Sequence, residues 1–275
     1  MIMAKNINEA EFTIFDTETT GLDPAGGDKI VEIAGIRIRG QETLGVFQTL
    51  VNPGRPISEA AFRVNNISAQ MLEGAPAIEE ALPKFLHFAK GSCLCSYNAG
   101  FDLGFINQEL LLITKEPLRG FRVVDILKMA RRLLPGLARY ALWFVAEQLN
   151  IKDKQAHRAL SDVELTLDVF NKLREILYLK GVSDFGQFLS LFAVDAHFVQ
   201  GLNAQKLSRI QEAIDLGVGL KIKYVASGGF AVSEREVLPK ELRQENQRSY
   251  LVAFCRLRNE ERTFRVDGIL HLEIV

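Results

Sequence analysis

IFDTETTG, residues 14–21, is the stretch of the chain that says most about its architecture and chemistry. It closes a predicted strand, Glu11–Thr17, and places Asp16 and Glu18 two residues apart, so both carboxylates lie on one face of the strand. Two negative charges this close raise each other's pKa unless a cation lies between them. Mg²⁺ and Mn²⁺ prefer carboxylate oxygen, so the pair could form half of a metal site. On its own, an Asp-x-Glu at a strand end is more often a solvated terminus.

The segments around this stretch predict an α/β domain. Strands are expected at Glu11–Thr17, Lys29–Arg39 and Leu44–Asn52, and the turns between them are too short for crossover helices, so they should form an antiparallel meander. A helix should follow, kinked or shifted by Pro83 and ended by Gly91. The further elements expected are a strand, Ser92–Tyr97, and the helices Asp102–Ile113, Val124–Leu134, Tyr140–Leu149 and Leu160–Tyr178.

Two more segments place chemically active side chains at the edges of apolar elements. Asp102 follows the strand Ser92–Tyr97 and opens the next helix, where a carboxylate could simply cap free N–H groups. His157 and Asp162 lead into the last of these helices. Their separation is about 140° on a helix with 3.6 residues per turn, so both can face one site only if His157 lies on the loop before the helix. Each segment is ordinary, but the ordered set of four carboxylates and one histidine is not.

The segments IFDTETTGL, SYNAGFD and HRALSDVELT resemble the three motifs of the DEDDh, or DnaQ-like, 3′-to-5′ exonucleases, a group that includes the proofreading ε subunit of bacterial DNA polymerase III. The resemblance extends from about residue 11 to residue 178. It implies a ribonuclease-H-like fold, a mixed sheet flanked by helices, with two divalent ions, Mg²⁺ or Mn²⁺, able to clamp a scissile phosphate. It also implies that Asp16, Glu18, Asp102 and Asp162 hold the metals and that His157 is the general base, a role that suits its reference pKa near 6.5.

The same resemblance implies contacts to the terminal nucleotide. Thr19 and Gly21 would offer backbone contacts, while Leu22 and Phe101 would stack or wedge against bases, although core packing explains Phe101 nearly as well. In AFRVNNIS, Asn65 stands where many relatives have a histidine that helps to hold the 3′ nucleotide, so substrate preference stays open. The residues expected to touch substrate are therefore Thr19, Gly21, Leu22, Asn65, Phe101 and His157.

Basic side chains between the second and third motifs allow two interpretations. They could form a strip that contacts phosphates, or most of them could be a solvated helix face. Trp143, with apolar neighbours, is expected to pack within its helix layer rather than to bind a ligand. The basic residues are Lys128, Arg131, Arg132, Arg139, Lys152, Lys154 and Arg158.

The C-terminal region has a different pattern, with two helical segments followed by short β-type runs. QEAIDLGVGLKIKYVASG, SEREVLPKEL and RSYLVAFCRLRNEERTFRVDGIL resemble the WYL domain of bacterial regulators, which implies a small Sm- or SH3-like β-barrel that binds a nucleotide or nucleic-acid ligand. Ser249 replaces the name-giving tryptophan, and Gly268 occupies a place often taken by arginine. Arg256 and Arg258 could bind single-stranded nucleic acid or only keep the module in solution. The expected divisions are an exonuclease domain, 1–180, a helical connector, 181–209, and the WYL-like domain, 210–275.

Composition and charge exclude several classes of protein. With 48% hydrophobic and 24% charged residues, the chain has globular composition, and a net charge of −1 argues against a generally basic nucleic-acid coat. The longest run without Asp, Glu, Lys or Arg, Thr43–Gly54, is far shorter than the roughly 18 residues of a membrane span. No membrane partner and no secretion signal are expected, and the three cysteines, Cys93, Cys95 and Cys255, suit a reducing compartment, which predicts a cytoplasmic protein.

The sequence predicts a metal-dependent 3′-to-5′ exonuclease that releases nucleoside monophosphates from single-stranded or frayed DNA ends, as in DNA repair. One alternative keeps the chemistry but takes RNA, because nothing in these residues settles 2′-hydroxyl recognition. The other is a nonenzymatic sensor whose C-terminal module binds a nucleotide or nucleic-acid ligand, although pure binding needs no acidic cluster. A polymerase partner stays open, because the family also includes free-standing enzymes.

Overall fold

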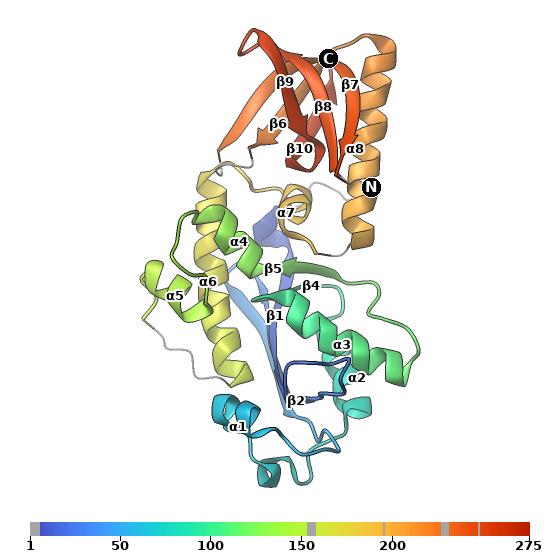
Figure 1. Ribbon diagram of the computed structural model, residues 1–275. Coiled ribbons are helices and arrows are strands. Elements are labelled where there is room, and N and C mark those ends of the chain that lie inside the picture. Colours follow the sequence, from blue (N-terminus) through green and yellow to red (C-terminus); the bar gives the residue numbers. More distant parts are fainter. Residues whose placement is uncertain (1–5, 153–157, 195, 227–230, 247) are drawn as a thin grey trace. The chain divides into compact units, whose positions relative to one another are not determined.

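The computed structural model describes residues 6–152, 158–194, 196–226, 231–246 and 248–275 (Figure 1). The chain divides into two compact units, one formed by Asn6–Glu175 and the other containing Ile176–Val275. Within the described residues, no helix has the length and apolar content that a bilayer crossing requires. Each unit has its own sheet and is described by itself.

The first unit is built on a mixed sheet with the strand order β3-β2-β1-β4-β5. β1 pairs antiparallel with β2, and β2 with β3, which confirms the predicted meander, whereas β1–β4 and β4–β5 are parallel. Placing β1 in the middle buries both of its faces and puts its end among loops and helix starts. The strands are β1, Glu11–Thr19; β2, Ile30–Arg39; β3, Glu42–Leu50; β4, Cys93–Ser96; and β5, Arg122–Asp125.

Helices cover both faces of this sheet, and phenylalanines fix which helix meets which face. Phe12 of β1 contacts Phe170 of α6 edge-on, with ring centroids 5.1 Å apart, while Phe15 contacts Phe85 of α2 at 5.5 Å. Successive strand residues point to opposite faces, so α6 and α2 lie on opposite sides of β1 (Figure 1). The helices are α1, Glu59–Asn65; α2, Ile78–Ala89; α3, Ala99–Ile113; α4, Ile126–Leu133; α5, Leu142–Gln148; and α6, Ala159–Leu179, with 3-10 turns at Ile7–Glu9 and Ala69–Leu72.

Several boundaries differ from expectation for local reasons. Residues 122–125 form β5, so α4 begins at Ile126, where the side chain of Asp125 caps it by accepting from the N–H groups of Leu127 and Lys128. α3 begins at Ala99, because Asn98 adopts a left-handed backbone before it (φ 68°). α2 starts at Ile78 and runs through Pro83, so the proline does not shift its start. The helix α1 was not predicted.

The second unit contains an antiparallel five-stranded sheet with the order β10-β6-β7-β8-β9. The ladders between the described strands do not join β9 to β10, so the predicted closed barrel is not shown. β7 runs through Pro239, where a register shift accommodates the missing N–H. Its elements are α7, Phe185–Phe192; α8, Ala196–Leu216; β6, Leu220–Val225; β7, Val232–Glu245; β8, Arg248–Cys255; β9, Glu260–Arg265; a 3-10 turn, Val266–Gly268; and β10, Ile269–Ile274.

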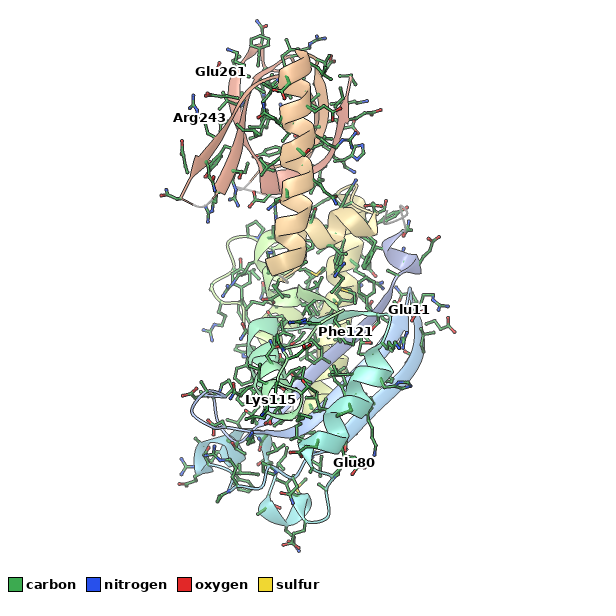
Figure 2. All side chains as sticks on the ribbon, turned by 90° about the vertical axis from the view of Figure 1, so that its right-hand side faces the viewer. Glu11, Glu80, Lys115, Phe121, Arg243 and Glu261 are labelled. Atoms are coloured by element: carbon green, nitrogen blue, oxygen red, sulfur yellow. The ribbon has the colours of Figure 1, made fainter. Side chains whose placement is uncertain are left out.

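The second unit has a core of its own between α8 and the sheet. Ile210 and Ala213 of α8 are fully buried with residues from every strand of the sheet, including Leu251 and Phe264. Tyr224 stands edge-on to Phe264, with centroids 5.1 Å apart, while Arg243 and Glu261 lie on the outside of the sheet (Figure 2). All three cysteines, Cys93, Cys95 and Cys255, are buried and form no disulfide.

Candidate metal centre

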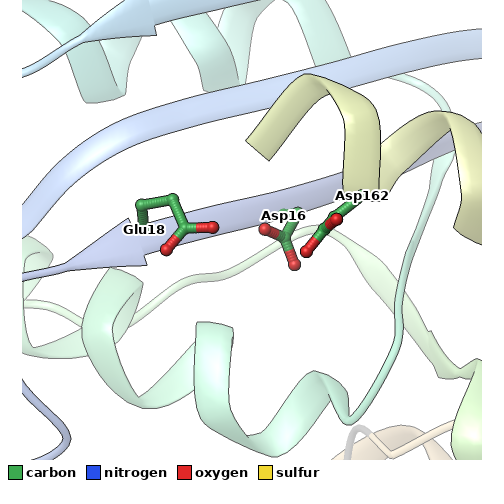
Figure 3. Close-up of side chains that lie close together, drawn as sticks. All are labelled: Asp16, Glu18 and Asp162. Atoms are coloured by element: carbon green, nitrogen blue, oxygen red, sulfur yellow. The ribbon is translucent and has the colours of Figure 1, made fainter. Parts of the chain in front are cut away.

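Three carboxylates meet where β1 ends and α6 begins. Asp16, Glu18 and Asp162 each place one oxygen so that the three atoms lie within 4.8 Å of one another (Figure 3). Asp16 and Glu18 share the face of β1 that carries Phe12, and Phe12 packs on α6. Asp162 lies in the first turn of α6, so packing of that helix on this face brings the third carboxylate to the first two.

The surroundings of the cluster disfavour negative charge. Burial raises the pKa of Asp16 well above its ordinary value, and the nearby carboxylates of Asp102, Glu18, Asp162 and Glu32 raise it further. Burial, followed by the charges of Asp162 and Glu32, raises the pKa of Glu18 to about 8. Such a cluster must bind either protons or cations, and its all-oxygen donor set fits a hard divalent cation such as Mg²⁺ or Mn²⁺.

Asp102 lies beside this cluster, with hydrogen bonds to both of its carboxylate oxygens. Oδ1 accepts from the Thr17 N–H at 3.0 Å and from the Thr17 hydroxyl at 2.8 Å, and Oδ2 accepts from the Ser96 hydroxyl. Burial raises its pKa to about 6, and these hydrogen bonds oppose the rise. Asp102 does not cap α3, which begins three residues earlier, and its expected role as a metal ligand stays a prediction.

His157, the expected general base, lies outside the described residues. In the chain, His157 stands two residues before Ala159, where α6 begins. Its role stays a prediction. Lys154, from the proposed basic strip, also lies outside the described residues.

Glu32, on β2, is a residue that sequence reasoning missed. Its side chain is fully buried, and the Cα atoms of Glu32 and Glu18 are partners in the β1–β2 ladder. Arg158 donates to it from Nε at 3.1 Å and from Nη2 at 2.9 Å, so Arg158 is engaged here and is not part of a free phosphate-binding strip. The signal was an acidic residue inside the apolar run KIVEIAGI, because Glu is rarely buried without a partner.

A cavity of about 310 Å³ adjoins Glu18 and is mostly apolar. One wall is α1, which presents Ala60, Ala61 and Val64, and Leu22 stands at the cavity with 83% of its side chain exposed. Phe101 is half-buried and packs on Phe105, with centroids 5.1 Å apart. The cavity therefore gathers five expected substrate contacts, Thr19, Gly21, Leu22, Asn65 and Phe101.

Asn65 is almost fully buried, and its carboxamide is used within the protein. Its nitrogen donates to the Thr19 carbonyl at 3.3 Å, its oxygen accepts from the Ile67 N–H at 3.0 Å, and a hydrogen bond to Glu18 partly opposes the rise in that carboxyl's pKa. Asn65 thus links the end of α1 to the strand that carries Glu18. Contact with a nucleotide stays a prediction for this residue.

Two aromatic residues near the basic segment lie close to guanidinium groups. Trp143 is 44% exposed and stands edge-on to Phe144 of the same helix, with ring centroids 5.6 Å apart. The Arg139 guanidinium lies 5.5 Å from the Trp143 ring centroid, and that of Arg131 lies 5.9 Å from the Tyr140 ring centroid. Exposed aromatic rings and guanidinium groups are compatible with nucleic acid, and that role stays a prediction.

Comparison with known proteins agrees with this geometry. A family model described as Exonuclease matches residues 13–170, and one described as WYL domain matches residues 205–274. The chain is 39% identical over 192 residues, 68% of its length, to DNA polymerase III PolC-type of Caldanaerobacter subterraneus subsp. tengcongensis, of which it covers 13%. It is 37% identical to the DNA polymerase III subunit epsilon-like protein of Rhodobacter capsulatus over 72% of this chain and 28% of that protein. It is 38% identical to the DNA polymerase III subunit epsilon of Treponema pallidum, over 59% of this chain and 75% of that protein.

The first two of these relatives are much longer than the region that matches. Among solved structures, Exonuclease X in complex with 5′ overhanging duplex DNA is 27% identical, with a TM-score of 0.50, covering 62% of this chain and 94% of that chain. The nuclease domain of 3′hExo, a DEDDh family member bound to rAMP, is 18% identical with a TM-score of 0.55 and the same coverage. Exonuclease I is 18% identical with a TM-score of 0.57, covering 89% of this chain and 55% of that chain. The first unit has this ribonuclease-H-like exonuclease fold.

Proposed function

Because the chain belongs to the DEDDh, or DnaQ-like, exonuclease family, we propose that its first unit is a metal-dependent 3′-to-5′ exonuclease that removes nucleoside monophosphates from DNA ends. One observation carries the proposal: the carboxylates of Asp16, Glu18 and Asp162 converge beside a cavity with apolar walls. A phosphate would be repelled by this cluster alone, so the arrangement makes chemical sense only when cations are bound between the carboxylates and the substrate.

The residues present fit such cations. Asp16, Glu18 and Asp162 would hold them, with Asp102 beside them as the fourth carboxylate. Bound divalent ions would supply Lewis-acid stabilisation of the charge that develops on the phosphate. His157 would accept the proton of the attacking water, for which an imidazole is suited near neutral pH. Thr17 and Ser96 keep Asp102 in position through their hydrogen bonds.

The cavity would receive the terminal nucleotide. Backbone groups of Thr19 and Gly21 would contact it, and the exposed Leu22 and the half-buried Phe101 would lie against its base. An apolar cavity of about 310 Å³ suits a base that has left its stack, which favours single-stranded or frayed ends over intact duplex. DNA is the proposed substrate because of two relatives that match this chain over 75% and 90% of their own length. Both are named DNA polymerase III subunit epsilon.

For the second unit, we propose a WYL-like module at residues 210–275, joined to an exonuclease domain at 1–180 by a connector at 181–209. The WYL family match to residues 205–274 and the self-contained core support this division. The module would bind a nucleotide or nucleic-acid ligand. A polymerase partner is a separate proposal, supported by a relative named DNA polymerase III subunit epsilon, and binding assays with a DNA polymerase test it.

Digestion of 5′-labelled oligonucleotides tests the proposed activity. DNA and RNA of the same sequence are incubated with Mg²⁺, with Mn²⁺ and with EDTA. We expect shortening from the 3′ end with either metal, none with EDTA, and faster digestion of single-stranded DNA than of RNA. Faster digestion of RNA would reassign the substrate, and tight binding without product in either metal would favour the nonenzymatic sensor.

Variants test the assigned residues. Asp16→Asn and Asp162→Asn should abolish digestion, because each removes a carboxylate of the cluster. His157→Ala should lower turnover by about 100- to 10,000-fold, the usual contribution of a general base, while leaving Mn²⁺ binding largely intact. Glu80→Gln on the exposed face of α2 is the control and should have no effect. Full activity of Asp16→Asn would contradict the assignment.

A further inference from the structure

We infer that the Glu32–Arg158 ion pair positions the first turn of α6, and with it Asp162, against the carboxylates of β1. The inference rests on the proposed function and assigns a role to two residues outside the acidic cluster. Neither residue needs to touch a metal or a substrate for this role. They would act through Asp162, as positioning residues.

The carboxylate of Glu32 joins three separate segments of the chain. Its Oε1 accepts from Nη2 of Arg158 at 2.9 Å and from Nε2 of Gln48 at 3.0 Å, and its Oε2 accepts from Nε of Arg158 and from the Ala159 N–H, both at 3.1 Å. Glu32 is fully buried on β2, opposite Glu18. A buried carboxylate with two hydrogen bonds to each oxygen is held in a single orientation.

The Glu32 carboxylate also caps the N-terminus of α6. The N–H groups of a helix's first turn have no partner within the helix, and a nearby anion suits the positive end of the helix dipole. Arg158 cannot supply an oxygen cap from its own side chain, and Glu32 binds the Ala159 N–H from the neighbouring sheet. The starting point of α6 is therefore set by a residue on β2.

Asp162 is connected to this anchor by one helical turn. Its N–H donates to the Arg158 carbonyl at 3.0 Å, and Arg158 is attached to Glu32 through its side chain. Glu32 in turn lies across the β1–β2 ladder from Glu18. One buried carboxylate thus sets the position of the β1 half and the α6 half of the cluster relative to each other.

A tether is needed because the cluster opposes its own assembly. When they are ionised, Asp16, Glu18 and Asp162 repel one another, because their oxygens lie within 4.8 Å, so a loosely held first turn of α6 would move Asp162 away. Packing of Phe170 on Phe12 holds α6 farther along the helix, but not at its first turn. The Glu32–Arg158 pair acts at that turn.

A second Glu–Arg ion pair, half-buried and formed between β1 and β2, provides a control. Glu11, at the start of β1 (Figure 2), accepts from Nε of Arg37 at 2.9 Å and also from Arg39, both on β2. It is at the opposite end of β1 from Glu18. Glu11→Gln therefore removes a comparable ion pair without touching the start of α6.

The test measures Mn²⁺ affinity by calorimetry in the full chain, with amide hydrogen exchange of Ala159–Asp162 as a readout independent of activity. Glu32→Gln and Arg158→Gln should each weaken Mn²⁺ binding about 10- to 100-fold, the usual effect of losing a residue that orients a metal ligand. Both should speed exchange at the first turn of α6. In digestion assays, kcat should fall by a similar factor, with little change in the KM for oligonucleotide.

The remaining variants separate positioning from general stability. Glu11→Gln should lower Tm without changing Mn²⁺ affinity, and Glu32→Gln/Arg158→Gln should lose no more affinity than either single variant. If Glu32→Gln does not fold, Arg158→Gln tests the inference instead, because the Arg158 side chain is the more exposed partner of the pair. Unchanged Mn²⁺ affinity in folded Arg158→Gln, or an equal loss in Glu11→Gln, would overturn the inference. If the wild-type chain cuts no oligonucleotide, the proposed function fails, while Mn²⁺ affinity and exchange still test the tether.

Discussion

At Asp16 and Glu18, burial and like charge act in the same direction. Each carboxyl loses hydration and faces other carboxylates, so its pKa rises, and for Glu18 it rises to about 8. Glu32 is a buried carboxylate whose charge contributes to these rises, yet hydrogen bonds from Arg158, Gln48 and the Ala159 N–H outweigh burial and lower its own pKa. The difference lies in the partners: Glu32 has its cation within the protein, whereas the cluster must obtain one from solution.

This difference predicts how the metal-free protein responds to pH. The pKa of Glu18 is 4.5 in the unfolded chain and about 8 in the folded protein. Between these two pH values, the folded state keeps a proton on Glu18 that the unfolded state has released. Stability in EDTA should therefore be greatest below pH 4.5, as far as this residue is concerned, and should fall as pH rises through that window. Mn²⁺ should protect more at the upper end of the window, because it replaces the proton.

Scanning calorimetry in EDTA and in Mn²⁺, at the two ends of this pH window, checks the prediction. Glu18→Gln should flatten the pH dependence in EDTA, because its amide does not titrate. A Tm in EDTA that is independent of pH for the wild-type chain would be inconsistent with a raised pKa of Glu18 in the folded state.

Two prolines show how the same residue acts differently in a helix and in a strand. Pro83 lies inside α2, where its missing N–H leaves the Glu79 carbonyl without its helical partner, and the helix nevertheless continues because Leu82 and Phe85 anchor it to the sheet. Pro239 lies in β7 beside a register shift, where the ladder is already irregular. Packing overrides propensity in the first case, and local irregularity accommodates the ring in the second.

Pro83→Ala should stabilise the first unit. The ring is exposed, so little packing is lost, and alanine restores the hydrogen bond to the Glu79 carbonyl. The gain should be about 2 kcal/mol, the helix cost of proline less its benefit in the unfolded chain. Urea unfolding measures this, and Pro239→Ala serves as the comparison, with a smaller gain expected. A loss of stability in Pro83→Ala would mean that the proline sets a bend that packing requires.

At the scale of the whole molecule, the chain carries two cores. The first surrounds β1, with Phe12 and Phe15 on its two faces, and the second lies between α8 and the C-terminal sheet. Every residue of the second core belongs to the region 210–272. A domain with its own core unfolds as a cooperative unit, so each unit should have its own transition.

Substitutions in each core test this organisation. Phe264→Ala should lower only the transition of the second unit, and Phe85→Ala only that of the first, each by about 3–5 kcal/mol, as expected for a buried phenylalanine. Calorimetry with and without Mn²⁺ identifies the transition of the first unit, because only that unit contains the acidic cluster described above. Digestion should survive Phe264→Ala at low temperature. A single transition that both variants lower would contradict independent cores.

The sequence by itself determined the features that depend on the periodicity of strands and helices over a few residues. The two-residue spacing of Asp16 and Glu18 places them on one face of β1, the short turns produce the meander, and the motif order predicts the fold and the family. The spacing of His157 and Asp162 sets a condition, that His157 precede the helix if both are to face one site, and the placement of His157 stays a prediction.

Only the tertiary structure decided which distant residues meet. Glu32 and Arg158 are 126 residues apart, and no local pattern pairs them; their contact exists because α6 packs against β1 and begins beside β2. The α1 wall of the cavity and the burial of Asn65 arise in the same way. Backbone periodicity acts over a few residues, whereas packing and the pairing of buried charges depend on the position of every surrounding element, so no short stretch of sequence records them.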